Sequence, residues 1–147
     1  MRRFVFPLRS VLKLRRVQED AASRDLATVR AQREREEGLL ANLHRLWQQT
    51  AENLRTAATA NQVAHLPSLS ARLKRLEEHI AATALRLDAL RIREAQAYEK
   101  LLEAARQRGV VEKLHDRRLR EFKAEERRRL TCAIDELATL RHGRKPW

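Results

Sequence analysis

A heptad pattern of apolar residues runs without a break from Leu69 to Val111. Steps of four and three residues in turn connect Leu69, Leu73, Leu76, Ile80, Thr83, Leu87, Leu90, Glu94, Ala97, Leu101, Ala104, Arg108 and Val111. Ten of these thirteen positions are apolar, and charged residues are frequent between them. A narrow seam that is kept over about six heptads predicts a coiled coil, in which one face of this helix packs against a partner helix.

The part of the chain before this seam can supply the partner helix. No proline occurs between Pro7, which suits the first turn of a helix, and Pro67. The apolar seam of this part is less regular and consists of Leu8, Val11, Leu12, Leu14, Ala21, Ala22, Leu26, Val29, Leu40, Leu43, Trp47, Leu54 and Ala57, with Thr50 as a polar member. Residues 32–37 read QREREE and contain no apolar residue. Either the helix contact is weak there, or charged side chains extend over the seam.

The heptad periodicity is lost over residues 59–68, and this stretch predicts the turn between the two helices. Pro67 disfavours a helical conformation at Leu66, and Ser68 is suited to cap the next helix. We therefore predict an all-α protein, with two long helices in an antiparallel coiled-coil hairpin that forms a single domain. The predicted bounds are 7–60 for the first helix, 61–68 for the turn, 69–141 for the second helix and 142–147 for a frayed tail, with Gly143 as the C-cap.

The second helix is predicted to be longer than the first. A fold-back about residue 64 places residue i opposite roughly residue 128 − i, so that Pro7 faces Glu121. No segment then lies opposite the last part of the chain, from about Phe122. This overhang carries an apolar stripe of Leu130, Ile134, Leu137 and Leu140 among basic residues. An unpaired apolar stripe on a basic helix is typical of a docking element.

The composition restricts the fold and the location. Only 4% of the residues are aromatic and 35% are charged, with three glycines and three prolines, so a turn-rich sheet protein is excluded. Disorder is the competing interpretation, and the long leucine periodicity opposes it. The single cysteine, Cys132, excludes an intrachain disulfide bond and fits a reducing compartment. No apolar run has the length of a signal-peptide core or a membrane span, and we expect a cytoplasmic location.

The sequence contains no arrangement of residues that predicts catalysis. The three glycines are isolated, so no phosphate-binding loop is present. The five histidines are far apart and lack the Cys or His neighbours that a zinc site needs. Acidic pairs such as Glu77–Glu78 lie in charged helical stretches, where ion pairs on a solvated face are the ordinary interpretation. We therefore expect no enzymatic activity, no cofactor and no metal ion.

Both ends of the chain resemble the flagellar type III export protein FliJ family. The opening FVFPLRSVLKLRRVQEDAASRDLA (residues 4–27) has an aromatic and basic lead, a leucine-containing first turn, a basic step, and then Glu-Asp and small residues. The stretch REFKAEERRRLTCAIDELATLRHGRK (residues 120–145) resembles the arginine-rich end of that family, including its acidic-Leu-Ala signature. The related stalk proteins of virulence type III secretion systems share the same layout.

The resemblance implies a soluble coiled coil of the flagellar export apparatus, similar to the central stalk of rotary ATPases. The implied partners are the export ATPase ring, the membrane export gate and export chaperones, through which the protein would sit peripherally at the cytoplasmic face of the inner membrane. By this resemblance the regions Leu8 to Arg16 and Phe122 to Leu137 would contact the ring, with the candidate residues Leu8, Val11, Leu12, Arg15, Arg16, Phe122, Arg127, Leu130, Ile134 and Leu137. The candidates for the gate are Leu39, Leu43, Leu46, Trp47 and Leu76.

The gate candidates also have an explanation in the residues themselves. Trp47 falls on the seam of the first helix and either fills the helix interface or belongs to a partner surface. Leu39 and Leu46 lie beside that seam and widen the apolar stripe. A two-stranded coil does not bury so wide a patch, which favours a partner surface near the turn.

The net charge of +12 suggests two alternative functions. The first is a nucleic-acid-associated coiled coil, suggested by the Arg127–Arg129 cluster. Basic and acidic residues are interleaved, however, and few aromatic residues are available for stacking on bases, so no specific nucleic acid is expected. The second is a membrane-surface helix formed by the overhang, which lacks the bulky apolar face that strong insertion requires.

Overall fold

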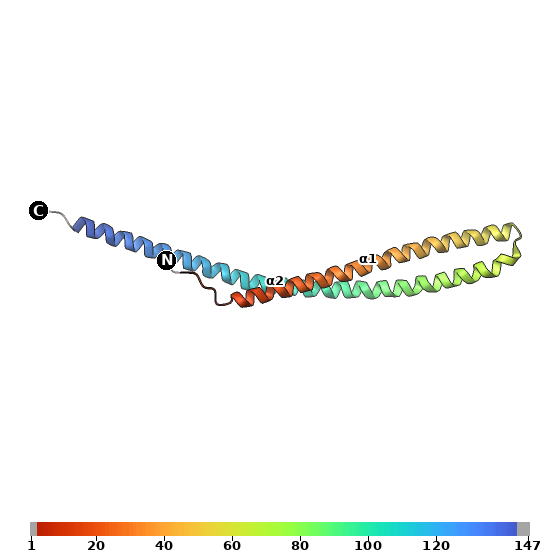
Figure 1. Ribbon diagram of the computed structural model, residues 1–147, viewed down its shortest axis with the longest axis horizontal. Helices are drawn as coiled ribbons and strands as arrows, with labels where there is room; N and C mark the ends of the chain where they lie inside the picture. The colour runs from red at the N-terminus through yellow and green to blue at the C-terminus, as the bar shows by residue number, and fades with distance from the viewer. Residues whose placement is uncertain (1–2, 144–147) are drawn as a thin grey trace. The chain divides into compact units, whose positions relative to one another are not determined.

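The computed structural model describes residues 3–143 and contains three helices in that range. Helix α1 spans Arg9–Thr59, a short 3-10 helix spans Val63–His65, and helix α2 spans Leu66–Gly143 (Figure 1). The described part of the chain has no strand, so the protein is all-α as predicted. No helix in the described range is long and apolar enough to cross a membrane.

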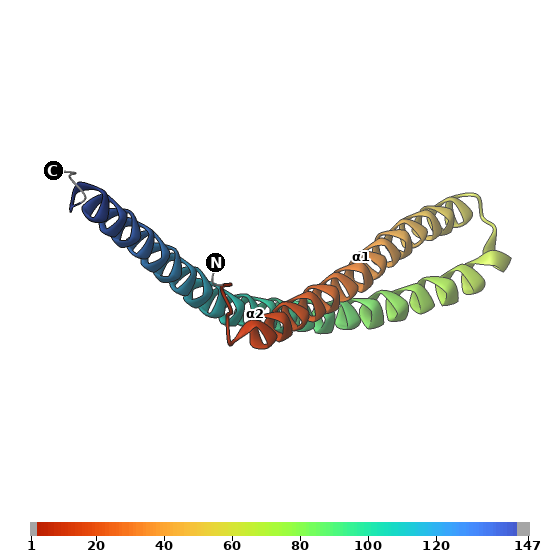
Figure 2. The ribbon, with the colours of Figure 1, turned by 60° about the vertical axis from the view of Figure 1, so that its left-hand side comes forward.

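The chain divides into two compact units. The hairpin unit comprises Asp20–Leu102, and the terminal unit comprises Met1–Glu19 together with Glu103–Trp147. Within the hairpin unit, α1 and α2 leave the turn side by side and antiparallel (Figures 1 and 2). In the terminal unit, the first turns of α1 pack on α2, also antiparallel, as the ion pairs of Arg16 with Glu112 and of Glu19 with Arg108 show. The prediction of a single domain stays a prediction.

The end of α1 is set by an asparagine in a left-handed conformation. Asn61 has φ 57°, and the Gln62 N–H donates to the carbonyl oxygen of Ala57 at 2.9 Å. A weaker hydrogen bond of 3.4 Å joins the Asn61 N–H to the Ala58 carbonyl oxygen. These two bonds form a Schellman motif, which satisfies carbonyl groups that the helix end would otherwise leave without a donor. Asparagine is suited to this position because it adopts positive φ more readily than most residues.

The start and the end of α2 differ from the prediction. Leu66 is helical, with φ −61° and ψ −45°, and Pro67 occupies the first turn, where its missing N–H breaks no helical hydrogen bond. Ser68 is therefore inside the helix, and its hydroxyl donates to the His65 carbonyl oxygen at 2.9 Å instead of capping α2. Gly143 is the last helical residue and lacks the positive φ of a C-cap. The rest of the predicted frayed tail, residues 144–147, lies outside the described residues.

The predicted seam of α2 is confirmed at every step. All thirteen positions between Leu69 and Val111 are buried or half-buried, and Thr83 and Leu87 expose only 1% and 4% of their surface. Burial of this stripe against α1 contributes hydrophobic stabilisation to the fold. Among the residues of α1, those buried in the seam are Leu12, Leu26, Val29, Leu43, Thr50 and Ala57.

The predicted seam of α1 is wrong at its start. Leu14 is 54% exposed, and Leu8 and Ala21 are also exposed. The observed seam starts at Leu12 and continues in steps of three and four residues through Arg15, Glu19, Ala22 and Leu26. Every position on this path as far as Ala57 is buried or half-buried. Leu14 lies one residue away from that path, so the helical rotation of about 100° per residue turns it towards solvent.

Candidate partner-binding surfaces

The candidate ring residues between Leu8 and Arg16 fall into three groups. Leu12 is buried and Val11 is half-buried, so both pack within the terminal unit. Arg15 donates to the Gln107 side-chain oxygen at 2.6 Å, and Arg16 pairs with Glu112 at 3.0 Å. Leu8 is the one apolar member of this group that reaches the surface, with 37% of its area exposed.

A cluster of aromatic rings, which the sequence analysis did not predict, attaches the N-terminal lead to α2. Phe6 is 7% exposed and meets the His115 ring edge-to-face at a centroid distance of 4.9 Å. Phe4 lies 5.6 Å from the His115 ring and 5.5 Å from the Phe122 ring. Phe122, a candidate ring residue, is therefore half-covered by the lead. The predicted fold-back register places Pro7 opposite Glu121, and it therefore already brings the aromatic lead close to Phe122.

The predicted overhang begins directly after Phe122. From Lys123 to Gly143 every residue except the half-buried Glu126 is exposed. The apolar stripe of this segment is uncovered, with exposed fractions of 61% for Leu130, 63% for Ile134, 64% for Leu137 and 69% for Leu140. Arg127 is exposed beside it. Such a row of large apolar residues at helical spacing is a surface that fits a partner helix or groove.

The candidate gate residues lie in the hairpin unit, and only some of them are accessible. Leu43 is 8% exposed and belongs to the seam, whereas Leu39 and Leu46 expose 41% and 39% of their surface. Trp47 is half-buried, and its indole N–H donates to a Glu77 carboxylate oxygen at 3.1 Å. Leu76 is half-buried in the α2 seam. Trp47 thus fills the helix interface in part and also lines a shallow depression with His44 and Ile80.

The polar stretch QREREE places charged side chains in the seam. Arg33 pairs with Glu94 at 3.3 Å, and Arg30 pairs with the same carboxylate at 2.9 Å. Glu36 accepts from Arg86 at 3.2 Å. Of the two interpretations of this gap, charged side chains extend over the seam, and they form a layer of ion pairs between the helices.

A second charged layer lies in the terminal unit. The Arg108 guanidinium is paired with both Glu19 and Glu112. The hydrogen bond to Glu19, with the charges of Glu112 and Glu19, raises the pKa of Arg108 above its ordinary value. These are structural ion pairs. In the part of the chain that the structure describes, no group of three His, Cys, Asp or Glu residues is placed to hold a metal ion.

These features define the class of the protein: an antiparallel coiled coil in which the longer helix continues past its partner and presents an uncovered apolar stripe. The family model described as "Flagellar FliJ protein" matches residues 4–146, and the chain belongs to the FliJ family. Membership makes it a protein of flagellar export, in a family of non-catalytic export components. Searches among curated proteins and among solved structures gave no match.

Proposed function

We propose that this protein is a stalk-like coupling factor of the flagellar export apparatus. In this role it links the export ATPase ring to the membrane export gate and engages export chaperones. It acts in the cytoplasm, at the inner face of the inner membrane, and reaches that membrane through its partners. It performs no catalysis and uses no cofactor, so its contribution is mechanical and interfacial.

One observation carries this proposal: the buried seam and the uncovered stripe occur on the same helix. Over Leu69–Val111 the apolar residues of α2 are covered by the rest of the chain. Between Leu130 and Leu140 they are not, although the segment is equally helical. A paired helical shaft with an unpaired extension suits a protein that transmits contacts from one partner to another better than a flexible linker would.

The exposed candidates are the ones that we assign to partners. For the ATPase ring these are Leu130, Ile134, Leu137 and Arg127 of the overhang, with Leu8 directly before α1. For the gate they are Leu39 and Leu46, with the exposed edge of Trp47. Leu12 and Leu43 are buried and would influence these contacts only through the packing of the helices.

The test is a mixture of this protein with the ATPase of its own export system. We expect faster phosphate release and more complete assembly of the ATPase oligomer, measured by a phosphate assay and by light scattering. A rate and an oligomeric state that both stay unchanged over an excess of this protein would contradict the coupling role.

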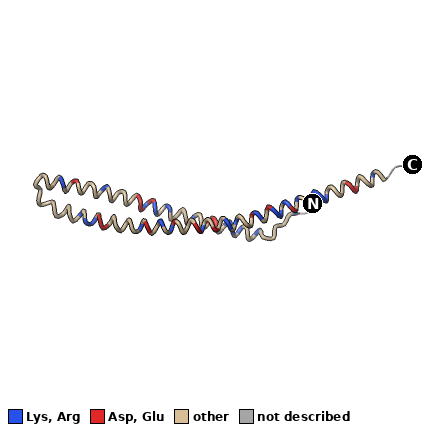
Figure 3. Tube along the Cα trace, turned by 180° about the vertical axis from the view of Figure 1, so that it is seen from behind, with Lys and Arg blue, Asp and Glu red and all other residues tan. Residues whose placement is uncertain are grey.

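A nucleic-acid function is not favoured by the charge distribution. Lys and Arg residues are interspersed with Asp and Glu along both helices (Figure 3). A basic chain of this kind binds random DNA at low salt through phosphate contacts, and that binding falls steeply as the salt concentration rises.

A further inference from the structure

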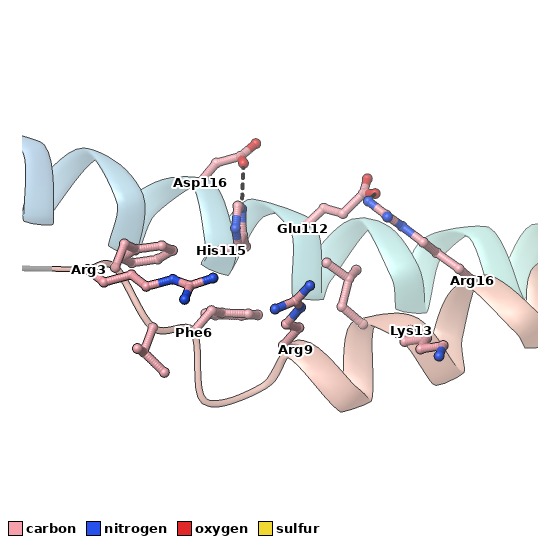
Figure 4. Close-up of a pocket in the computed structure, with 11 residues that line it drawn as sticks. Arg3, Phe6, Arg9, Lys13, Arg16, Glu112, His115 and Asp116 are labelled. Atoms are coloured by element: carbon pink, nitrogen blue, oxygen red, sulfur yellow. Dashed lines mark hydrogen bonds and ion pairs between the residues drawn. The ribbon is translucent and has the colours of Figure 1, made fainter.

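The terminal unit contains a groove that is lined by none of the exposed residues assigned above to the ATPase ring or the gate, although Leu12 and Arg16 of its lining are ring candidates by the family resemblance. It runs beside the aromatic cluster, between the N-terminal lead, the first turns of α1 and one turn of α2 (Figure 4). Four basic residues surround it, namely Arg3, Arg9, Lys13 and Arg16. Phe4, Phe6 and Leu12 contribute the apolar part of its lining.

Two carboxylates of the described residues line the groove, and neither forms an ion pair with Arg3, Arg9 or Lys13. Glu112 accepts from Arg16 at 3.0 Å and also pairs with Arg108. Asp116 lies 3.1 Å from the His115 ring. Among residues 3–143, no ion pair includes Arg3, Arg9 or Lys13. Three cations therefore border one groove without forming an ion pair with any carboxylate of the described residues.

The geometry of these cations suits a carboxylate ligand. The Arg3 and Arg9 guanidinium groups extend towards the same space beside Phe6 (Figure 4). Arg9, Lys13 and Arg16 follow one another at intervals of four and three residues, so they lie along one face of α1. A guanidinium group binds a carboxylate through two parallel hydrogen bonds, and a row of cations at helical spacing fits a row of acidic side chains.

The apolar lining distinguishes the class of ligand. A free phosphate or a lipid headgroup would contact only the basic rim. Phe6 is buried, but Val5 at the mouth of the groove is 76% exposed, and its apolar surface is available to a ligand. An acidic protein segment that also carries apolar side chains would use both the rim and this surface.

We propose that this groove is a docking site for an acidic segment of a partner protein that carries apolar residues among its carboxylates. The proposal does not rest on the coupling function, because it concerns binding of a peptide by this chain alone. Its contacts are the rim residues Arg3, Arg9 and Lys13 with carboxylates, and Val5 with an apolar side chain.

The test measures binding of a fluorescein-labelled peptide of alternating glutamate and leucine to the full chain by fluorescence anisotropy. The variant Arg9→Glu/Lys13→Glu should weaken binding at least about tenfold, because two charge-assisted contacts become repulsive. The control Arg72→Glu/Lys74→Glu makes the same change of net charge on exposed residues of the hairpin unit, and it should weaken binding less than about threefold. Circular dichroism would show whether each variant keeps its helices.

Three further measurements separate the acidic segment from other anions. A peptide with serine in place of leucine should bind several-fold more weakly, and inorganic phosphate at equal ionic strength should not compete. Vesicles of phosphatidylglycerol should be bound no more weakly by the groove variant than by the control variant. The proposal is overturned if both double variants weaken peptide binding equally, if the serine peptide binds as well, if phosphate displaces the peptide, or if only vesicle binding depends on Arg9 and Lys13.

Discussion

Glu94 is the residue on which the charged layer of the hairpin unit depends. Its carboxylate is 17% exposed, accepts a hydrogen bond from Arg30 at 2.9 Å and forms an ion pair with Arg33 at 3.3 Å. A carboxylate in a seam position is tolerated when such partners compensate for lost hydration. The same pairs favour one alignment of the helices, since a shift of one heptad would place Glu94 opposite other residues.

The first prediction concerns the two ion pairs of Glu94. Glu94→Ala should lower the free energy of unfolding by about 1–2 kcal/mol, because Arg30 loses its hydrogen-bonded carboxylate and Arg33 keeps only the longer pair with Glu37, at 3.9 Å. Urea unfolding followed by circular dichroism measures this change. The matched control is Glu52→Ala, which removes an exposed pair with Arg55 at 3.9 Å and should change stability by less than about 0.5 kcal/mol. Equal effects of the two substitutions would contradict a structural role for the charged layer.

Arg108 should make no contribution to the pH dependence of stability under ordinary conditions. Its pKa is raised in the folded protein, chiefly by the Glu19 hydrogen bond. A raised pKa adds stability that is complete below the pKa of the unfolded chain and is lost only as the pH rises through the folded value. Both values lie in the strongly alkaline range.

The contacts of individual residues were only partly predictable from the sequence. The QREREE stretch is open to two interpretations, because its own sequence does not show which residues of the second helix lie opposite it. The fold-back register nevertheless set Arg33 near Glu94, which is itself a seam position. Leu14 was assigned wrongly because hydrophobicity alone favoured it over Arg15, whereas the seam follows the regular steps of the helix.

At the scale of the elements, two leucines of α2 provide the second prediction. Leu87 is 4% exposed and Leu85, two residues away, is 72% exposed. Leu87→Ala should lower the free energy of unfolding by about 2–4 kcal/mol, because it leaves a cavity in the seam. Leu85→Ala should change it by less than about 0.5 kcal/mol. Chemical denaturation of both variants tests the pair, and comparable losses would show that the outer face of α2 is also packed.

The N-terminal lead provides the third prediction. Phe6 is the one buried residue among residues 3–8, so Phe6→Ala should detach the lead from α2. Hydrogen exchange should then be faster at the amides around Phe6 and Arg9, while the helix content stays the same. Val5→Ala is the control, because Val5 is 76% exposed. Unchanged exchange in the Phe6 variant would mean that the aromatic cluster does not hold the lead.

Element boundaries were less predictable than the elements. Pro67 disfavours helix at the residue before it and favours the first turn of a helix that contains it. The predicted start of the second helix, at residue 69, follows from the first effect, whereas the observed start of α2 at Leu66 follows from the second. Asn61 ends α1, and its signal in the sequence is an asparagine four residues after Ala57, the last seam residue of this helix. The α2 seam was predictable because thirteen regularly spaced positions agree with one another.

At the scale of the whole molecule, the fourth prediction separates folding from function. The triple variant Leu130→Gln/Ile134→Gln/Leu137→Gln should keep the helix content and shift the free energy of unfolding by less than about 1 kcal/mol, because these side chains are exposed. It should lose the stimulation of the export ATPase that we propose. The control Leu85→Gln/Ile92→Gln removes exposed apolar residues of the hairpin unit and should keep the stimulation. Full stimulation by the triple variant would exclude the overhang as the ATPase contact.

The fold of the molecule was predictable, but its partners were not. A heptad pattern specifies which residues of one chain pack together, because that packing satisfies the pattern itself. The exposed side chains of Leu39, Leu46 and the overhang show only that apolar surface is available to a partner. Their assignment to a ring and a gate is the proposal made above, and the triple variant of the overhang tests its ring contact.

The continuity of α2 has a consequence for the speed and strength of binding. A short helix in isolation is rarely populated, because its first turn must order several residues for one hydrogen bond. Residues 123–143 avoid that barrier, because they extend a helix that is already nucleated over Leu66–Phe122. Adding a turn to an existing helix is nearly neutral in free energy. A partner therefore meets a recognition helix that is already formed, and little conformational entropy remains to be lost when the two proteins associate.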